Sequence, residues 1–256
     1  EPVYRAGYDR NFWIWDKFDG NNQYLLTADV ARGDGADNSV FHILKLNTME
    51  VVAEYQGKPT LDMYSKILFD AGMEYGTCLM VVENNGIGIS ILEKLVDLGY
   101  PNLYYSMKST HEFVEAYQGE ALDKAIPGFT TSTKTRPLVV AKLEEFIRNK
   151  MLTTYSSRLY HEFKTFIWNN GKPQAMRSYN DDLIMAIAIG CWVKDTALQV
   201  NKRETEYKKA MISSMYKSDS IMNTTIKGMQ GYSETTKEKQ QKFKEQLTQH
   251  SWIYKG

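Results

Sequence analysis

The sequence predicts an α/β fold, in which a mixed sheet of five or more strands is flanked by helices. Near the start of the chain, three apolar runs rich in β-forming residues follow one another with only short loops between them, which is typical of an antiparallel meander. Strand-like and helix-like patterns then alternate, and strand–helix–strand units favour parallel pairing through right-handed crossovers. Single acidic residues interrupt or end several apolar runs, and these acids bear on function.

The composition is that of a globular protein. The chain has 256 residues, 43% of them hydrophobic, which suits one large domain or a domain with an extension. No apolar run approaches the ~20 residues of a membrane span, so we expect a soluble protein without a membrane partner. The net charge is zero, but the first 100 residues hold 15 acidic and 8 basic residues, and the remainder carries the compensating basic excess. Such a division is compatible with a metal-dependent enzyme that acts on a polyanion.

The first half of the chain supplies the predicted sheet. The meander is expected at residues 23–30, 40–46 and 50–55, and Gly33 and Gly35 lie in its first loop. Four further elements follow in the order helix, strand, helix, strand, at residues 61–76, 77–83, 88–99 and 102–107. The run at 77–83 is apolar throughout and is therefore expected to be buried on both faces.

The second half is predicted to be mainly helical. An amphipathic helix is expected at 135–151, and a long apolar helix at 181–198 opens on two acids. The pattern at 157–168 is compatible with either helix or strand. We expect residues 1–200 to form one domain, and the polar residues 201–256 to form a helical or partly disordered extension.

Isolated carboxylates recur at the ends of these elements. Asp29 falls inside the apolar run "YLLTADV", and Glu83 ends "CLMVVENNGIG". Asp181 and Asp182 open the last apolar helix, in "RSYNDDLIMAIAIG". In this mixed sheet we expect the first and fourth strands to be neighbours at the centre, so that their carboxylates can meet at one end of the sheet and the last helix can bring its first turn to the same place.

A group of carboxylates repels itself unless a cation neutralises it. Oxygen ligands of this kind suit hard ions such as Mg²⁺ or Mn²⁺. Two such ions about 4 Å apart can clamp the attacking water and the leaving oxygen of a phosphodiester hydrolysis. The pattern therefore favours a metal-dependent phosphodiesterase.

Each acid also has a structural interpretation. Asp181 and Asp182 can cap their helix, and Glu83 can be a residue at a strand end before a turn. Asp37 can be a turn residue or a supporting acid of the metal site. His42 and His161 lie in apolar stretches and are expected to be packed side chains rather than ligands.

Three motifs in order, "LLTADVARGDGADNSVFHI", "MVVENNGIG" and "NGKPQAMRSYNDDLIMAIAIG", resemble the C-terminal nuclease domain of the large terminase subunit of tailed bacteriophages, nearest to its T-even-type branch. The resemblance covers about residues 10–200. It implies a ribonuclease H-like fold of the RuvC type.

By this resemblance, Asp29, Glu83 and Asp182 are catalytic metal ligands, with Asp181 as the second choice within the pair of aspartates. The implied cofactor is Mg²⁺ or Mn²⁺, as two ions. Asp37 matches an acid in the corresponding hairpin of the family, while Asn180 stands where the family often has His.

The resemblance further implies an endodeoxyribonuclease that cuts double-stranded viral DNA during genome packaging, in the cytoplasm of the infected bacterial host. The portal, the small terminase subunit and an N-terminal packaging ATPase are the implied partners. A phosphate-binding loop of the Gly-x-x-x-x-Gly-Lys-Ser/Thr type is absent from the sequence, so we expect the chain to correspond to the nuclease domain alone.

Four basic residues are candidates for contacts with DNA phosphates, with solvated surface positions as the alternative: Lys108, Lys134, Arg136 and Lys142.

Three other functions remain open from the residues alone. A Holliday-junction resolvase or a transposase-type nuclease shares the fold and the metals. An actin- or sugar-kinase-type ATPase also begins with an acid-bearing strand and a glycine hairpin, but it needs a second such hairpin in a second domain, and the sequence has none. A non-catalytic DNA-gripping or portal-docking module would use the acids only structurally.

Overall fold

The computed structural model describes residues 1–7, 9–31, 37–107 and 125–195. Lys108 and the predicted extension at 201–256 lie outside this part of the chain. Within it, no helix combines the length and the apolar character needed to cross a membrane.

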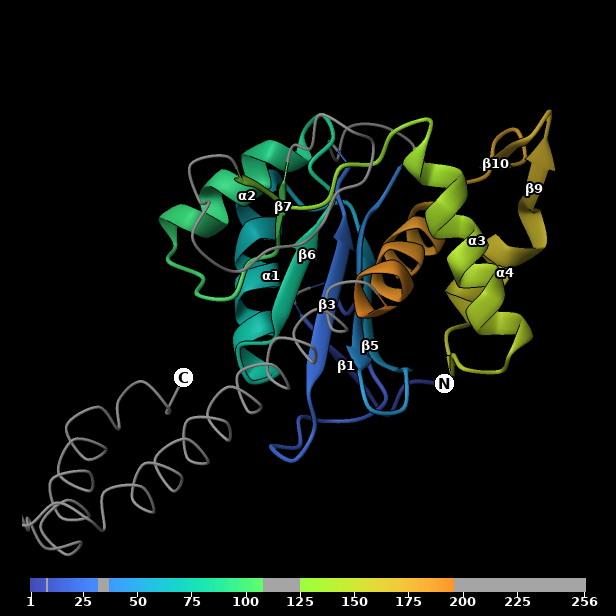
Figure 1. The fold of residues 1–256 in the computed structure, drawn as a ribbon. Coiled ribbons are helices and arrows are strands. Elements are labelled where there is room, and N and C mark those ends of the chain that lie inside the picture. Colours follow the sequence, from blue (N-terminus) through green and yellow to red (C-terminus); the bar gives the residue numbers. More distant parts are fainter. Residues whose placement is uncertain (8, 32–36, 108–124, 196–256) are drawn as a thin grey trace, which may run out of the picture. The chain divides into compact units, whose positions relative to one another are not determined.

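A six-stranded mixed sheet forms the centre of the fold (Figure 1). Its strands, in spatial order, are β1 (Tyr4–Ala6), β2 (Phe12–Ile14), β5 (Glu50–Gly57), β4 (Ser39–Lys45), β3 (Tyr24–Asp29) and β6 (Leu79–Val82). The predicted meander corresponds to β3, β4 and β5, which pair antiparallel. β6 pairs with β3 in parallel, from Leu25↔Leu79 to Ala28↔Val82. The first and fourth predicted strands are therefore neighbours, as expected.

The fifth predicted strand, at 102–107, joins this sheet only at one point. Leu103 forms a single parallel bridge with Met80, and β7 (Tyr105–Met107) then leaves to pair with β8 (Ala125–Pro127). Phe129 occupies the next part of the β6 edge, because its N–H donates to the Val82 carbonyl at 2.9 Å. The prediction of a continuous fifth strand was wrong because two separate segments share that edge.

Helices cover both faces of the sheet (Figure 1). α1 (Leu61–Glu74) and α2 (Gly88–Asp97) pack on one face, and the other carries α3 (Thr135–Arg148), α4 (Ser157–Thr165) and a helix that begins at residue 182 and is described to 195. The alternation of side chains along β3 serves both layers. Leu26 and Ala28 pack with α1 and α2, while Leu25 packs with the other three helices.

The ambiguous segment at 157–168 contains both kinds of structure. Ser156 caps α4 by accepting the Leu159 N–H at 3.1 Å, and the helix ends at Thr165. β9 (Phe166–Asn169) follows at once and pairs with β10 (Lys172–Ala175) in a separate hairpin. The chain turns at Asn170 and Gly171, which both have positive φ.

The helix at 182–195 approaches the sheet closely at Gly190. A Cβ atom there would lie 2.7 Å from Leu44 Cδ1 and 3.1 Å from Thr27 Cγ2. A larger residue would push the helix away from β3 and β4.

We therefore expect Gly190→Val to lower the free energy of unfolding by about 1–3 kcal/mol, the usual cost of overpacking a core. Urea denaturation would measure the change. Gly20→Val is the matched control, because a Cβ at this exposed position meets nothing within 4 Å. The control should stay within about 0.5 kcal/mol of the unaltered chain; equal effects at both positions would contradict the close approach.

Candidate metal centre

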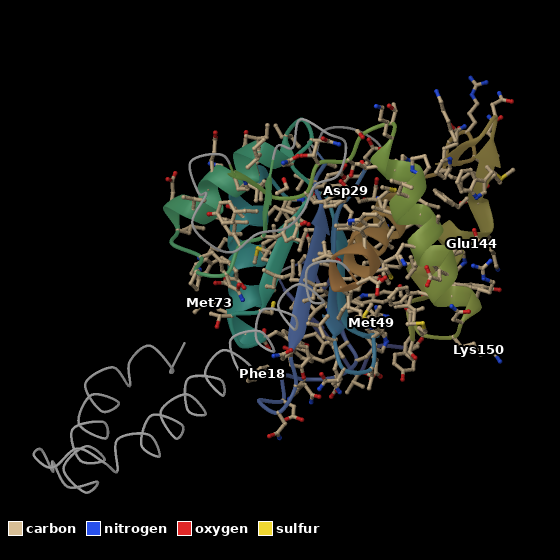
Figure 2. The ribbon with its side chains drawn as sticks, viewed as in Figure 1. Phe18, Asp29, Met49, Met73, Glu144 and Lys150 are labelled. Atoms are coloured by element: carbon tan, nitrogen blue, oxygen red, sulfur yellow. The ribbon has the colours of Figure 1, made fainter. Side chains whose placement is uncertain are left out.

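Asp29 is the last residue of β3, and Figure 2 shows it at the end of the sheet opposite to Phe18 and Met49. Strand alternation places it on the same face as Thr27, toward the helix at 182–195. Its Oδ1 accepts the N–H of Val30 at 2.7 Å. The Tyr64 hydroxyl of α1 donates to the Val40 carbonyl at 2.6 Å and lies 3.3 Å from the Asp29 carbonyl, so it contacts both strands at this end.

Glu83 follows β6 directly and lies beside the end of β3. Its N–H donates to the Ala28 carbonyl at 2.9 Å, so parallel pairing brings it next to Asp29. The Asn85 side-chain amide donates to Glu83 Oε1 at 2.9 Å and also contacts the Thr131 carbonyl. Gly88 permits this tight turn, since a Cβ there would lie 1.9 Å from the Glu83 carbonyl oxygen.

Asp182 is the first residue of the long apolar helix and points back to the loop after β3. Its Oδ2 accepts the Asn38 N–H at 2.8 Å and the Asn180 side-chain amide at 3.2 Å. Asp181, one residue earlier, has different partners. Its Oδ2 accepts the Ala175 N–H at 3.0 Å and forms an ion pair with Arg136.

The electrostatics place three of the acids together. Burial, the charge of Glu83 and a hydrogen-bonding contact with that carboxyl, and the charge of Asp182 raise the pKa of Asp29 well above its usual value. Burial also raises the pKa of Asp182 to about 6, against the lowering effect of the Asn38 N–H and with a further contribution from Asp37. Asp37 is itself exposed, so it is a neighbour of the site and not part of its buried centre.

Two carboxyl groups in contact are stable when a proton or a cation lies between them. The donors are all oxygen atoms, which fits Mg²⁺ or Mn²⁺. As the side chains stand, however, no group of three or more His, Cys, Asp and Glu residues in the described ranges is arranged to hold a metal ion. Asp29 and Glu83 meet, whereas Asp182 is directed to Asn38.

Two of the basic candidates, Arg136 and Lys142, form ion pairs with acids. Arg136 donates to Asp181 and, through Nε, to the Pro173 carbonyl at 3.0 Å, so it connects α3, β10 and the start of the last helix. Lys142 forms ion pairs with Glu145 and Asp195 at 2.7 and 2.9 Å. Lys134 is exposed immediately before α3.

Sequence patterns did not indicate that two buried polar side chains, Glu162 and His42, contact the first turn of the last helix. Glu162 accepts the Ile184 N–H at 3.1 Å, and His42 contacts the Leu183 carbonyl at 3.0 Å. His42 is buried as expected, but the prediction of a packed His161 was wrong, since that residue is exposed. Glu162 alternates with apolar residues on an amphipathic helix, and that pattern alone gives no sign that its carboxyl points inward.

The sheet order, with an antiparallel meander extended by a parallel strand and helices on both faces, defines a ribonuclease H-like fold. Within this class, the structure is similar to solved nuclease domains of phage large terminases. The large terminase nuclease from thermophilic phage G20c with bound magnesium has a TM-score of 0.56 and 17% identity, over 74% of this chain and 89% of that one. The nuclease domain of the Thermus phage P74-26 large terminase has a TM-score of 0.54 and 18% identity, over 73% and 86%.

A structure of the G20c nuclease with bound cobalt gives a TM-score of 0.56 at 16% identity, over 74% of this chain and 89% of that chain. No family model and no curated protein matches the sequence. At these identities, the similarities establish the fold.

Gly88 provides a test of how Glu83 is positioned. We expect Gly88→Ala to lower the free energy of unfolding by about 1–3 kcal/mol, because the new Cβ would overlap the Glu83 carbonyl and force the turn apart. Thermal and urea denaturation would measure it. Ile89→Ala, at an exposed position in the same helical turn, is the control and should change stability little.

Proposed function

We propose that the chain is a metal-dependent endonuclease that cuts double-stranded DNA, and that it is the nuclease domain of a phage large terminase subunit acting in viral genome packaging. The observation that carries this proposal is the contact between the Asp29 and Glu83 carboxyls, with Asp182 in electrostatic range, at the end of the parallel strand pair. The likeness of the fold to large terminase nucleases supports it.

The proposed metal ligands are Asp29, Glu83 and Asp182, with Asp181 as a further candidate. Asp182 is favoured over Asp181 because its charge reaches Asp29, whereas Asp181 is neutralised by Arg136. Both hydrogen bonds to Asp182 end on Oδ2, so the carboxylate can ligate through Oδ1 and keep them. Asp37 would add negative charge beside this group.

Two Mg²⁺ or Mn²⁺ ions at such a site would lower the pKa of an attacking water and stabilise the charge on the leaving 3′ oxygen. Asp29, Glu83 and Asp182 would hold the ions, and the ions would offset the repulsion that these carboxylates exert on one another. Arg136 holds Asp181 and the hairpin of β9 and β10 in a fixed relation to the site. The product end would be a 5′-phosphate.

Duplex DNA would lie across this end of the sheet with little sequence preference, because phosphate contacts carry no sequence information. Lys134 is our first candidate for a phosphate contact, and its position three residues after Thr131, whose carbonyl contacts Asn85 beside Glu83, supports this choice. Lys108, Arg136 and Lys142 are further candidates from the sequence.

The remaining assignments rest on the resemblance in sequence: the T-even-type branch, the host cytoplasm as the place of action, and the portal, small subunit and packaging ATPase as partners. G20c nuclease structures with bound magnesium, cobalt and zinc support a divalent cation as the cofactor.

A non-catalytic DNA-gripping module is the second candidate. It is favoured by the absence, within the described part of the chain, of a third acid already turned toward the other two. Cleavage assays separate the two functions.

We expect the chain to nick and linearise supercoiled plasmid with Mg²⁺ or Mn²⁺ and to lose this activity in EDTA. Asp29→Asn should reduce the rate at least about 100-fold, because one ligand of the proposed ions is removed. Agarose gel electrophoresis over time would measure both effects.

Asp16→Asn is the matched control. Asp16 pairs with Lys45, whose cross-strand partner Tyr24 begins β3, at the end opposite to Asp29. Its rate should equal that of the unaltered chain. If the folded protein binds the plasmid but does not cut it with either metal, the nuclease proposal is wrong and the gripping module replaces it.

DNA binding should depend on salt, and Lys134→Ala should lower the slope of log affinity against log salt concentration by about 1. Fluorescence anisotropy of a labelled duplex in Ca²⁺ would measure the slope without cleavage. Lys45→Ala is the control with the same change in charge, and it should leave the slope unchanged because Lys45 pairs with Asp16 at the end of the sheet opposite to Asp29. A larger effect at Lys45 would contradict the proposed DNA path.

A further inference from the structure

We propose that Glu162 and His42 are positioning residues that together hold one peptide group, the one that joins Leu183 to Ile184, and so fix the third carboxylate of the metal site, that of Asp182. This inference rests on the proposed function. Both side chains are buried, and neither belongs to the predicted ligand set.

Glu162 reaches the peptide from α4. Its Oε2 accepts the Ile184 N–H at 3.1 Å, and Gln56 of β5 donates to Oε1 at 3.4 Å. The residue is only 8% exposed. A buried carboxyl is costly unless hydrogen bonds compensate it, so the placement indicates a specific geometric role.

His42 reaches the same peptide from the sheet. Its Nε2 lies 3.0 Å from the Leu183 carbonyl oxygen, and a carbonyl only accepts, so Nε2 carries the proton. The ring is fully buried on β4. Thr27 of β3, two residues before Asp29, is the cross-strand partner of His42.

The Leu183 carbonyl and the Ile184 N–H belong to one peptide unit. His42 of β4 therefore holds the carbonyl of this peptide, and Glu162 of α4 holds its N–H. Rotation or sliding of the first helical turn would break both hydrogen bonds. Because Asp182 precedes this unit, the two contacts set the position of its carboxylate relative to Asp29.

The need for Glu162 follows from how this helix begins. The first intrahelical bond runs from the Met185 N–H to the Asp181 carbonyl at 2.9 Å, so the Ile184 N–H has no partner within the helix. An aspartate before a helix usually caps this N–H with its own side chain. Here the Asp181 side chain is turned to Ala175 and Arg136, and Glu162 supplies the missing acceptor.

The test compares Mn²⁺ affinity, measured by titration calorimetry, among the unaltered chain and three variants. Glu162→Ala removes the acceptor and should raise the Mn²⁺ dissociation constant about 10-fold, the lower range for residues that support metal ligands. Glu162→Gln keeps an oxygen for the Ile184 N–H and should stay within about twofold. Phe163→Leu, on the same helix, removes packing without touching the peptide, and should lower the melting temperature but not the affinity.

Unaltered affinity in a folded Glu162→Ala, or an equal loss in Phe163→Leu, would overturn the positioning role while leaving the proposed nuclease intact. If the unaltered chain binds no Mn²⁺, the proposed function fails and the positioning role fails with it.

A measurement on the unaltered chain does not depend on how the variants fold. Amide hydrogen exchange should find the Ile184 N–H protected, although first-turn amides of a helix lack intrahelical partners. Exchange at the rate of an unstructured peptide would overturn the contact with Glu162.

Discussion

The contact between the Asp29 and Glu83 carboxyls is the constraint on which the rest of the site depends. Parallel pairing of β3 with β6 ends both strands at the same level, and the Glu83 N–H bond to the Ala28 carbonyl brings Glu83 beside Asp29. Burial and the charge of Glu83 raise the pKa of Asp29. The two carboxyl groups are therefore stable side by side when a proton or a cation lies between them. This pair is the reason that a cation site is proposed at the end of β3 and β6.

The surrounding elements bring the third acid within range of this pair. Gly190 lets the helix at 182–195 lie close against the sheet, and Glu162 and His42 hold its first turn. Arg136 forms an ion pair with Asp181, whereas the charge of Asp182 acts on Asp29. The site is thus assembled from a strand end, a turn and a helix start that are far apart in the sequence.

The sheet and the acids were predictable because both leave local patterns. The β3–β4–β5 meander and the parallel β6 follow from apolar runs of strand length separated by turns or a helix. Asp29 stood out because a charge in a buried strand is costly without a partner. The edge of β6 was not predictable, since the choice between Leu103 and Phe129 as its neighbour depends on where a distant segment returns.

The sequence by itself determined the antiparallel meander, the parallel strand beside it and the carboxylates at their ends, because hydrophobic periodicity and turn residues act over a few positions. Only the tertiary structure decided how Asp181 and Asp182 differ and that Glu162 points inward, because these depend on Arg136, Ala175 and Ile184 coming together across the fold. Any predicted helix start implies backbone N–H groups that have no partner within the helix. The side chain that satisfies it is fixed only when another helix is packed beside it.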